Sequence, residues 1–396
     1  MSEPSRPAST LRKFFQLELL DNRYPALHGL RVLAILTVIQ FHVTTIFHPT
    51  PKLRLEDGFV TSSTTIFFGM DLFFMLSGFL IGSILIHSID SSGSQQIARF
   101  YIRRVCRTFP SYYLVLTVLA FAQARNAEQT ANLPFEYLYL TNFREGTPNS
   151  FVMSWGWSLA LEEQFYLTVP LLFVILGRLK SDWRRVGFLV ALWSVGLIVR
   201  LTIYLRHRPW NDLLLNHAIY FKTYTRFDTL IAGILLALVH RRWKREITEW
   251  LRHPLHRAIV AIVALTGLWL LLEPWMFGGE ALPLVHVFAW GTITTLMYFA
   301  ALILLLHSEG WIVTWLSRPY WRTLATLGYG VYLVHIPVIR NLVVPVALKL
   351  KERGASMGVL WTGGLMMAFV LSLAIGYLLH VFVEKPALRL RDWLAA

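Results

Sequence analysis

The sequence predicts an all-α, polytopic membrane protein built as a bundle of about ten transmembrane helices. Of its 396 residues, 55% are hydrophobic and only 15% are charged. A soluble protein of this length would carry about a quarter charged residues. The mean hydropathy is +0.51. Apolar stretches of about 20 residues recur along the chain, and each is long enough to cross the hydrocarbon core as a helix.

Ten such stretches can be drawn as spans, and an even number places both chain ends on the same side of the membrane. The third and the seventh are short. The sixth contains Lys222 and Arg226, so its apolar part begins near Phe227. The predicted spans cover residues 27–48, 64–89, 109–124, 156–177, 186–205, 218–240, 257–272, 284–306, 323–347 and 357–383.

The loop charges predict the orientation of the bundle. With a cytoplasmic N-terminus, the cytoplasmic segments hold roughly twice as many Lys and Arg residues as the opposite segments, as the positive-inside rule requires. Residues 1–23 are polar and basic without the apolar core of a signal peptide, so we expect a short cytoplasmic tail there. We expect the membrane domain to cover residues 24–385 and a second short cytoplasmic tail to cover residues 386–396.

Composition argues against several other classes of protein. The single cysteine, Cys106, rules out an internal disulfide and fits neither a Cys-based zinc site nor an iron–sulfur site, and no metal site is predicted. The formal net charge of +14 could indicate nucleic-acid binding. Basic membrane proteins, however, usually carry such charge in cytoplasmic loops, and no nucleic-acid-binding motif is present. We therefore expect the basic loops to contact the lipid bilayer and not nucleic acid.

The first span carries two residues that are costly inside a membrane, Arg31 and His42. Eleven residues of helix turn through roughly 1100°, so both side chains lie on one face, separated by roughly 16 Å along the axis. Charged and ionisable residues are tolerated in spans when they face protein or water. The pair is therefore a candidate functional site, although His42 alone could be a satisfied buried histidine.

Two carboxylates are predicted at the depth of His42. Asp71 in the second span and Glu162 in the fourth each lie about a quarter of the way down from the outer end. Three titratable groups from three spans at one depth predict a shared polar cavity. Asp71 could instead pair with Arg31 or Arg200. Of the adjacent acids at positions 162 and 163, we expect one to face the loop and the other to point inward.

Basic and polar residues elsewhere add further candidates. Arg104 and Arg107 share one face of an expected interfacial helix, where they could bind phosphate groups or simply anchor the helix to headgroups. Arg226 and Asp228 are expected to form a local pair, with Gly233 allowing close helix contact. Further possible cavity-lining residues are Tyr166 and His335, and His335 could alternatively bond a carbonyl freed by Pro337.

Seven segments, taken in this order, resemble the acyltransferase 3 family of integral membrane acyltransferases. Each match is weak alone, but together they follow the family's order over nearly the whole chain. They are Leu-His-Gly-Leu-Arg31 with His42, the Phe-Gly-Met-Asp71 segment, Arg104-x-x-Arg107, the Trp-Ser-Leu-Ala-Leu-Glu162 segment through Tyr166, Arg226-Phe-Asp228, Tyr-Gly-Val-Tyr-Leu-Val-His335, and Val383-Glu384-Lys-Pro386.

The resemblance implies a ten-helix bundle in a bacterial inner membrane. Such an enzyme moves an acyl group, most often acetyl, from cytoplasmic acyl-CoA to a hydroxyl, commonly on a glycan. Acyl-CoA would be a co-substrate, and no bound cofactor is implied. The family's marked pair matches Arg31 and His42, and its Arg-x-x-Arg element, linked to donor binding, matches Arg104 and Arg107. This chain has His28 where the family usually has Asp, and it resembles the stand-alone form without an extracytoplasmic esterase-like domain.

These observations predict a mechanism. The three arginines Arg31, Arg104 and Arg107 hold the donor phosphates, and His42 takes the proton of the acceptor hydroxyl as general base. Asp71 or Glu162 orients the imidazole and stabilises its charged form. A transporter or flippase of a glycan or lipid precursor is the alternative, because buried charges and broken helices suit it equally well. A third hypothesis is a structural or regulatory membrane subunit, but such a subunit would not require a buried His and Arg.

Overall fold

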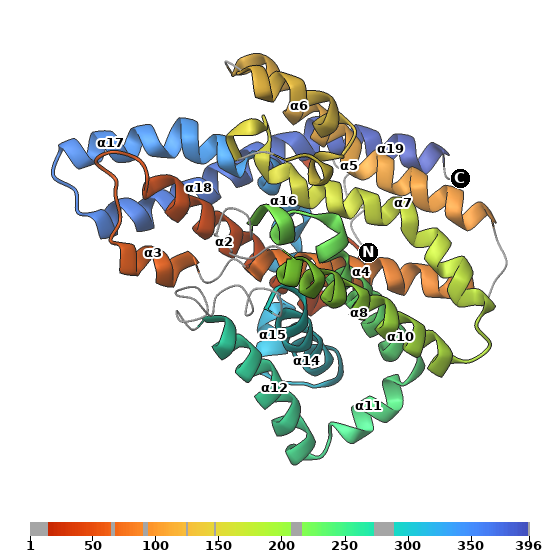
Figure 1. Cartoon of the computed structure of the whole chain (residues 1–396). Helices are drawn as coiled ribbons and strands as arrows, with labels where there is room; N and C mark the ends of the chain where they lie inside the picture. The colour runs from red at the N-terminus through yellow and green to blue at the C-terminus, as the bar shows by residue number, and fades with distance from the viewer. Residues whose placement is uncertain are drawn as a thin grey trace, which may run out of the picture.

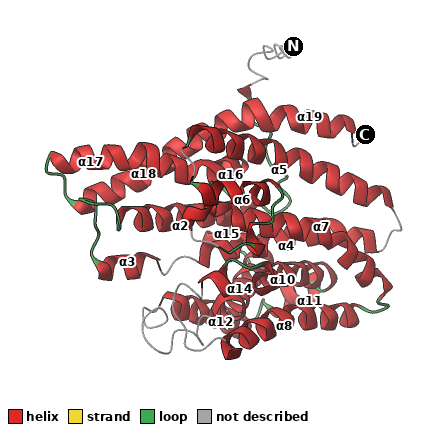
Figure 2. Cartoon of the chain, turned by 45° about the horizontal axis from the view of Figure 1, so that its top comes forward, coloured by secondary structure: helices red, strands yellow, loops and turns green. Residues whose placement is uncertain are grey.

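The computed structural model describes residues 15–64, 68–89, 94–123, 126–145, 148–206, 216–272 and 289–394. The regular secondary structure in these ranges is all helical, with loops and turns between the helices, and no strand occurs in them (Figures 1 and 2). The predicted all-α fold class is therefore confirmed. Figure 1 places α3 and α17 on the left of the molecule and the C-terminus on the right.

Eight helices of the described chain are long and apolar enough to cross a membrane. They correspond to the predicted spans other than the sixth and the eighth. The membrane helices begin and end as follows: α2 Pro25–Phe47, α4 Gly69–Ile89, α5 Ser94–Ala122, α7 Trp157–Arg178, α8 Asp182–Arg206, α10 Thr223–Arg242, α12 Pro254–Leu272, α14 Thr294–His307, α16 Pro319–Val338 and α18 Met357–Leu379. The shorter helices are α3 Asp57–Thr64, α6 Ala127–Tyr137, α11 Lys244–Trp250, α15 Trp311–Leu316, α17 Val344–Glu352 and α19 Lys385–Leu394.

The sixth and eighth predicted spans correspond to α10 and α14, and each differs from a simple apolar span for its own reason. Helix α10 carries buried charged residues and ends in His240, Arg241 and Arg242, which lowers its mean hydropathy. Helix α14 is a shorter apolar helix preceded by a π-helical turn. Residues 284–288 of the eighth predicted span lie outside the described residues.

Helix α10 packs against α4 at the centre of the bundle, and two glycines make this contact possible. A Cβ on Gly78 would collide with the backbone carbonyl of Leu230, and a Cβ on Gly233 would collide with that of Met75. Small residues at helix crossings let membrane helices approach closely. The predicted role of Gly233 in close helix contact is confirmed.

Two boundaries differ from the prediction. The arginines Arg104 and Arg107 lie within one continuous 29-residue helix, α5, and not on a separate interfacial helix, because the helix continues through Pro110. Most of the residues expected as a C-terminal tail belong to α19, which continues from α18 through a π-helical turn, His380–Glu384, and packs against α5. Pro337 is followed directly by another π-helical turn, Ile339–Val343, so the helix is disturbed there as predicted.

The N-terminal segment crosses the end of the bundle where α16 begins and α18 ends. Its backbone is held by side chains far away in the sequence: the Leu20 N–H donates to Thr326 at 3.3 Å, and the Arg322 guanidinium donates to the Leu20 carbonyl at 2.6 Å. The Glu18 N–H likewise donates to His380 at 3.2 Å. This part of the region expected as a tail is therefore packed on the helices.

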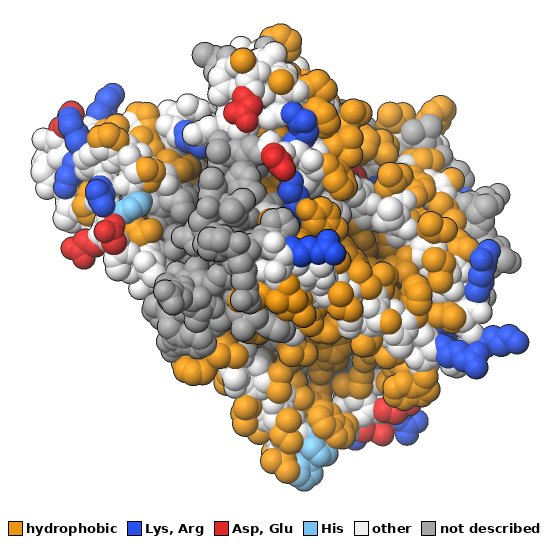
Figure 3. All heavy atoms as spheres, viewed as in Figure 1, with side chains coloured by type: hydrophobic (Ala, Val, Ile, Leu, Met, Phe, Trp, Pro, Cys, Tyr) orange, Lys and Arg blue, Asp and Glu red, His pale blue; other side chains and the backbone are white. Residues whose placement is uncertain are grey.

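The surface of the bundle is strongly apolar. Figure 3 shows hydrophobic side chains spread over much of one face, with Lys and Arg side chains at its left and right edges and a few near its middle. Large apolar side chains that are more than half exposed occur on α7, α8, α12 and α18, and a soluble protein would bury them. This is the surface that lipid would cover. Examples are Leu167, Leu171, Ile198, Ile262, Leu265, Trp269, Val359, Met366 and Val370.

Candidate active site

Two histidines meet where α2 and α16 come together, toward the C-terminal ends of both helices. His42 Nδ1 lies 3.2 Å from His335 Nε2, and the two rings are 4.8 Å apart at an angle of 64°. His335 is fully buried, whereas His42 is only partly buried. The region around this pair is called the histidine end below.

The hydrogen bonds define the tautomers of both rings. His42 Nδ1 lies 2.8 Å from the Val38 carbonyl, and His335 Nδ1 lies 2.6 Å from the Tyr332 carbonyl. A carbonyl can only accept, so each neutral ring carries its proton on Nδ1. His335 Nε2 is then a lone pair facing the His42 Nδ1–H, and the Nε2 lone pair of His42 is available to take a proton. The geometry therefore leaves the Nε2 of His42 unprotonated and holds its Nδ1–H against the Val38 carbonyl and His335.

The predicted partnership of His42 with Asp71 or Glu162 is wrong, because both carboxylates make other contacts. Asp71 pairs with Arg226 at 2.9 Å, with both side chains fully buried, and Thr229 lies 3.5 Å from the same carboxylate oxygen. Glu162 accepts hydrogen bonds from Ser77 at 2.7 Å and Tyr166 at 3.2 Å. The polar contacts of His42 within the described chain are the Val38 carbonyl and His335.

The predicted pairing of Arg226 with Asp228 is also wrong. Asp228 pairs with Arg200 of α8 at 2.7 Å, and both side chains are fully buried. Arg226 and Asp228 are two residues apart on α10, so they point about 200° apart around the helix and reach different neighbours. Gly196 and Gly291 make room for the second pair, since a Cβ at either position would press on the Asp228 carboxylate.

Glu162 and Glu163 both face neighbouring helices, which corrects the expectation that one of them faces the loop. Glu163 turns toward Thr108 of α5 and lies within Coulombic range of Arg104. Glu162 lies within Coulombic range of Arg104 and Arg31. Glu162 therefore belongs with the arginines and not with His42.

The three predicted donor arginines come together from two helices. Arg31 of α2 lies within Coulombic range of both Arg104 and Arg107 of α5, and all three side chains are partly buried. Arg104 lies over the Tyr166 ring, 5.0 Å from its centroid. Within the described part of the chain, none of the three forms an ion pair within 4 Å. Glu162 lies within Coulombic range of Arg31 and Arg104, and Glu384 within that of Arg107, so these carboxylates offset part of the repulsion among the guanidinium groups. Guanidinium groups bind phosphate through paired hydrogen bonds, so the region, called the arginine end below, is suited to phosphate.

Two groups of hydrogen-bonded polar side chains lie in the interior between these ends. The Tyr332 hydroxyl lies 2.5 Å from the Ser158 hydroxyl and donates to the Trp155 carbonyl at 2.9 Å. Ser158 stands one helical turn before Glu162 on α7, which in turn contacts Tyr166 beneath Arg104. Polar side chains are therefore spread through the interior between the histidine end and the arginine end. They are His42, His335, Tyr332, Ser158, Glu162, Ser77, Tyr166 and Arg104.

The connection between α5 and α7 is organised by a buried carboxylate that no sequence motif marks. Glu136 of α6 is fully buried and accepts the Val152 N–H at 2.8 Å and the Met153 N–H at 2.7 Å. The Asn132 amide donates to the Ser150 carbonyl at 3.0 Å. No local sequence signal marks these contacts, because each partner lies 16 to 18 residues away along an irregular loop.

This loop is expected to lose stability as pH rises. Burial raises the pKa of Glu136 from 4.5 to about 7, although the two backbone N–H groups oppose the rise. A raised pKa means that the folded loop favours the protonated acid, so its contribution is largest below pH 4.5 and is lost as pH passes through about 7. A shift of this size corresponds to about 3 kcal/mol.

The measurement is hydrogen exchange at the Val152 and Met153 amides between pH 4.5 and 8, corrected for the intrinsic exchange rate. The substitution Glu136→Gln should remove most of the pH dependence of their protection. Glu128→Gln, in the exposed first turn of the same helix, is the control and should leave it unchanged. Equal pH dependence in wild type and Glu136→Gln would contradict the assignment.

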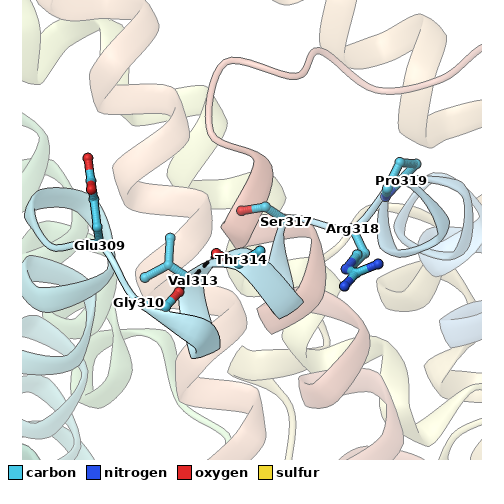
Figure 4. Close-up of a pocket in the computed structure, with 7 residues that line it drawn as sticks. All are labelled: Glu309, Gly310, Val313, Thr314, Ser317, Arg318 and Pro319. Atoms are coloured by element: carbon cyan, nitrogen blue, oxygen red, sulfur yellow. Dashed lines mark hydrogen bonds between the residues drawn. The ribbon is translucent and has the colours of Figure 1, made fainter.

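A hollow of about 480 Å³ lies elsewhere, on the connection between α14 and α16 (Figure 4). The Thr314 hydroxyl donates to the Gly310 carbonyl within it at 3.0 Å. None of the polar groups described above lines this hollow, so it is separate from the candidate site. Its lining residues are Glu309, Gly310, Val313, Thr314, Ser317, Arg318 and Pro319.

Fold and site together define an integral membrane protein with a partly buried histidine pair at one end of its interior and a group of three arginines at the other. The chain belongs to the acyltransferase 3 family: the family profile, described as an acyltransferase domain, matches residues 24–381. The family resemblance predicted from the motifs is thereby confirmed.

Curated relatives carry names from the same chemistry. The chain is 27% identical over 392 residues to "Putative peptidoglycan O-acetyltransferase YrhL" of Bacillus subtilis, covering 92% of this chain and 55% of the relative. It is 28% identical over 336 residues to "Peptidoglycan O-acetyltransferase OatA" of Listeria monocytogenes, covering 80% of this chain and 49% of the relative. The chain thus spans about half the length of these relatives. No solved structure gives a significant match to the chain.

Proposed function

We propose that this protein transfers an acyl group, most simply acetyl, from cytoplasmic acyl-CoA to a hydroxyl of a glycan or other carbohydrate-containing acceptor. Family membership and the names of the relatives support O-acetyl transfer to a cell-wall glycan. The observation that carries the proposal is the free Nε2 of His42 at one end of a polar interior that reaches three arginines at the other.

The donor binds at the arginine end. Arg31, Arg104 and Arg107 receive the phosphates of acyl-CoA, and the neutralisation of their mutual repulsion adds to the affinity. The pantetheine arm then runs along the polar interior toward His42. Eleven residues of α2 separate Arg31 from His42, which is roughly 16 Å, a distance that an extended pantetheine chain can span.

The chemistry takes place at the histidine end. His42 Nε2 takes the proton of the acceptor hydroxyl while the hydroxyl oxygen attacks the thioester carbonyl. His335 accepts the His42 Nδ1–H, keeps the ring in the correct tautomer and stabilises the imidazolium that forms. The thiolate of CoA leaves and recovers the proton from His42.

We further propose that the protein resides in a bacterial inner membrane with both termini in the cytoplasm, because the loop charges favour that orientation. The arginine end then faces the cytoplasmic donor, and the histidine end lies in the outer half of the membrane, nearer an acceptor on the opposite side.

Donor affinity is expected to depend on the unpaired arginines. Arg107→Ala should weaken acetyl-CoA binding to the protein in nanodiscs by about 10- to 100-fold, because a charge-assisted hydrogen bond is worth about 1.5–3 kcal/mol. Radiolabelled acetyl-CoA binding, competed by free CoA, measures the effect. Arg103→Ala is the matched control, because Arg103 is exposed on the same helix and should leave the affinity unchanged. Equal affinity of wild type and Arg107→Ala would refute the donor site.

A further inference from the structure

The indole N–H of Trp155 is a buried donor without an acceptor. Trp155 is only 4% exposed, and its Nε1 has no hydrogen-bond partner in the described part of the chain. A buried donor left unpaired costs about as much as a lost hydrogen bond, so such groups are rare and call for an explanation. The indole is a donor only and cannot be satisfied by another donor.

Trp155 lies beside the partner of the proposed base. The contact is with His335, the partner of the base: the two ring centroids are 6.1 Å apart at an angle of 71°, and His335 in turn contacts His42. The Trp155 carbonyl accepts the Tyr332 hydroxyl at 2.9 Å and the Ser158 hydroxyl at 3.3 Å. The unpaired indole is therefore part of the histidine end.

The loop that carries Trp155 is anchored by hydrogen bonds to its backbone. Glu136 accepts hydrogen bonds from the backbone of Val152 and Met153, three and two residues before Trp155, and a short 3-10 turn, Ser154–Gly156, leads directly into α7. A donor held in place by its surroundings needs little reorganisation when charge develops near it.

The other donors in this group are already committed. The Tyr332 hydroxyl and the Ser158 hydroxyl bond each other and the Trp155 carbonyl. His335 Nδ1–H and His42 Nδ1–H point at backbone carbonyls. Trp155 Nε1–H is therefore the uncommitted donor among these side chains.

We propose that Trp155 Nε1–H stabilises the oxyanion of the tetrahedral intermediate, as a catalytic residue of the acyl transfer; this inference rests on the function proposed above. The acceptor oxygen bonds to the thioester carbonyl carbon while His42 takes the hydroxyl proton, and the carbonyl electron pair moves onto oxygen as an oxyanion that accepts the indole N–H. When the intermediate collapses, the C–O double bond re-forms, the C–S bond breaks and CoA thiolate takes the proton from His42. A thioester carbonyl is a weak acceptor and an oxyanion a strong one, so the bond forms mainly in the transition state.

The test compares single-turnover and steady-state acetyl transfer from labelled acetyl-CoA to acceptor in membranes. Trp155→Phe keeps an aromatic ring but removes the N–H, and kcat is expected to fall about 10²- to 10³-fold with little change in KM for acetyl-CoA. Trp157→Phe is the matched control. Trp157 lies two residues after Trp155 and packs against Phe74 and Tyr220, so this variant should keep near wild-type kcat.

A second variant separates chemistry from folding. Replacement of Trp155 by benzothienylalanine, which puts sulfur in place of the N–H, keeps the shape of the ring and should show the same loss of kcat with an unchanged unfolding temperature. Near wild-type kcat in this variant would overturn the proposal. Absence of transfer by the wild type, in a preparation that binds acetyl-CoA, would instead overturn the proposed function itself, and the role of Trp155 with it.

Discussion

Replacement of His42 by alanine is expected to reduce acyl transfer by about 10²- to 10⁴-fold, the usual contribution of a positioned general base. His42 holds the Nε2 lone pair that takes the acceptor proton, since its Nδ1–H is committed to the Val38 carbonyl and His335. Binding of acetyl-CoA should remain, because the donor phosphates bind at the arginine end. The measurement is transfer of labelled acetyl in membranes at saturating donor, together with donor binding on the same preparation.

His335 supplies the internal control for this result. His335→Ala removes the acceptor for the His42 Nδ1–H and should lower kcat, whereas His335→Gln offers an amide oxygen in its place and should recover part of the rate. Rescue by glutamine distinguishes orientation of His42 from simple packing. Acyl transfer by His42→Ala at near wild-type rate would contradict the role of His42 as general base.

Replacement of Asp71 by alanine is expected to destabilise the protein by about 3–5 kcal/mol, the usual cost of removing one partner of a buried ion pair. Asp71 and Arg226 are 2.9 Å apart and both fully buried, so the variant leaves a guanidinium in a low-dielectric interior without its carboxylate. The second buried pair, Arg200 with Asp228, stands beside it on the same helix α10. The loss should appear as a lower unfolding temperature in detergent.

Two comparisons make this result specific. Glu249→Ala breaks the exposed Arg245–Glu249 pair of α11, which is 2.9 Å long, and should cost no more than about 0.5 kcal/mol. The double replacement Asp71→Leu with Arg226→Met removes both charges and should recover much of the stability lost in Asp71→Ala. An unfolding temperature for Asp71→Ala equal to that of the wild type would show that the Asp71–Arg226 pair does not stabilise the fold.

The two expected results assign catalysis to His42 and stability to the Asp71–Arg226 pair, which are different polar groups of one interior. The sequence marks His42, Asp71 and Glu162 alike as titratable residues within spans. The structure separates them: His42 joins His335, Asp71 joins Arg226, and Glu162 joins Ser77 and Tyr166. Depth along each predicted span does not reveal these partners, because they also depend on how each helix is rotated against its neighbours.

The sequence by itself determined the fold class, the positions of most spans and the family. Apolar length is a local property that the thickness of the bilayer imposes on each span separately, so it can be read without knowledge of the neighbours. The eleven-residue spacing of Arg31 and His42 likewise follows from the geometry of one helix. The convergence of the arginines was expected from the charges and the family motif, and the structure brings all three into Coulombic range.

Only the tertiary structure decided which residues are partners. The pairs His42–His335, Asp71–Arg226 and Arg200–Asp228 join residues on different helices, and the choice depends on how each helix is rotated and shifted against the next. Glycines such as Gly78 and Gly233 set those distances through backbone contact, an effect without a local signature. The unpaired indole of Trp155 is likewise visible only when all of its neighbours are in place, because hydrogen-bond satisfaction is a property of the whole surrounding packing.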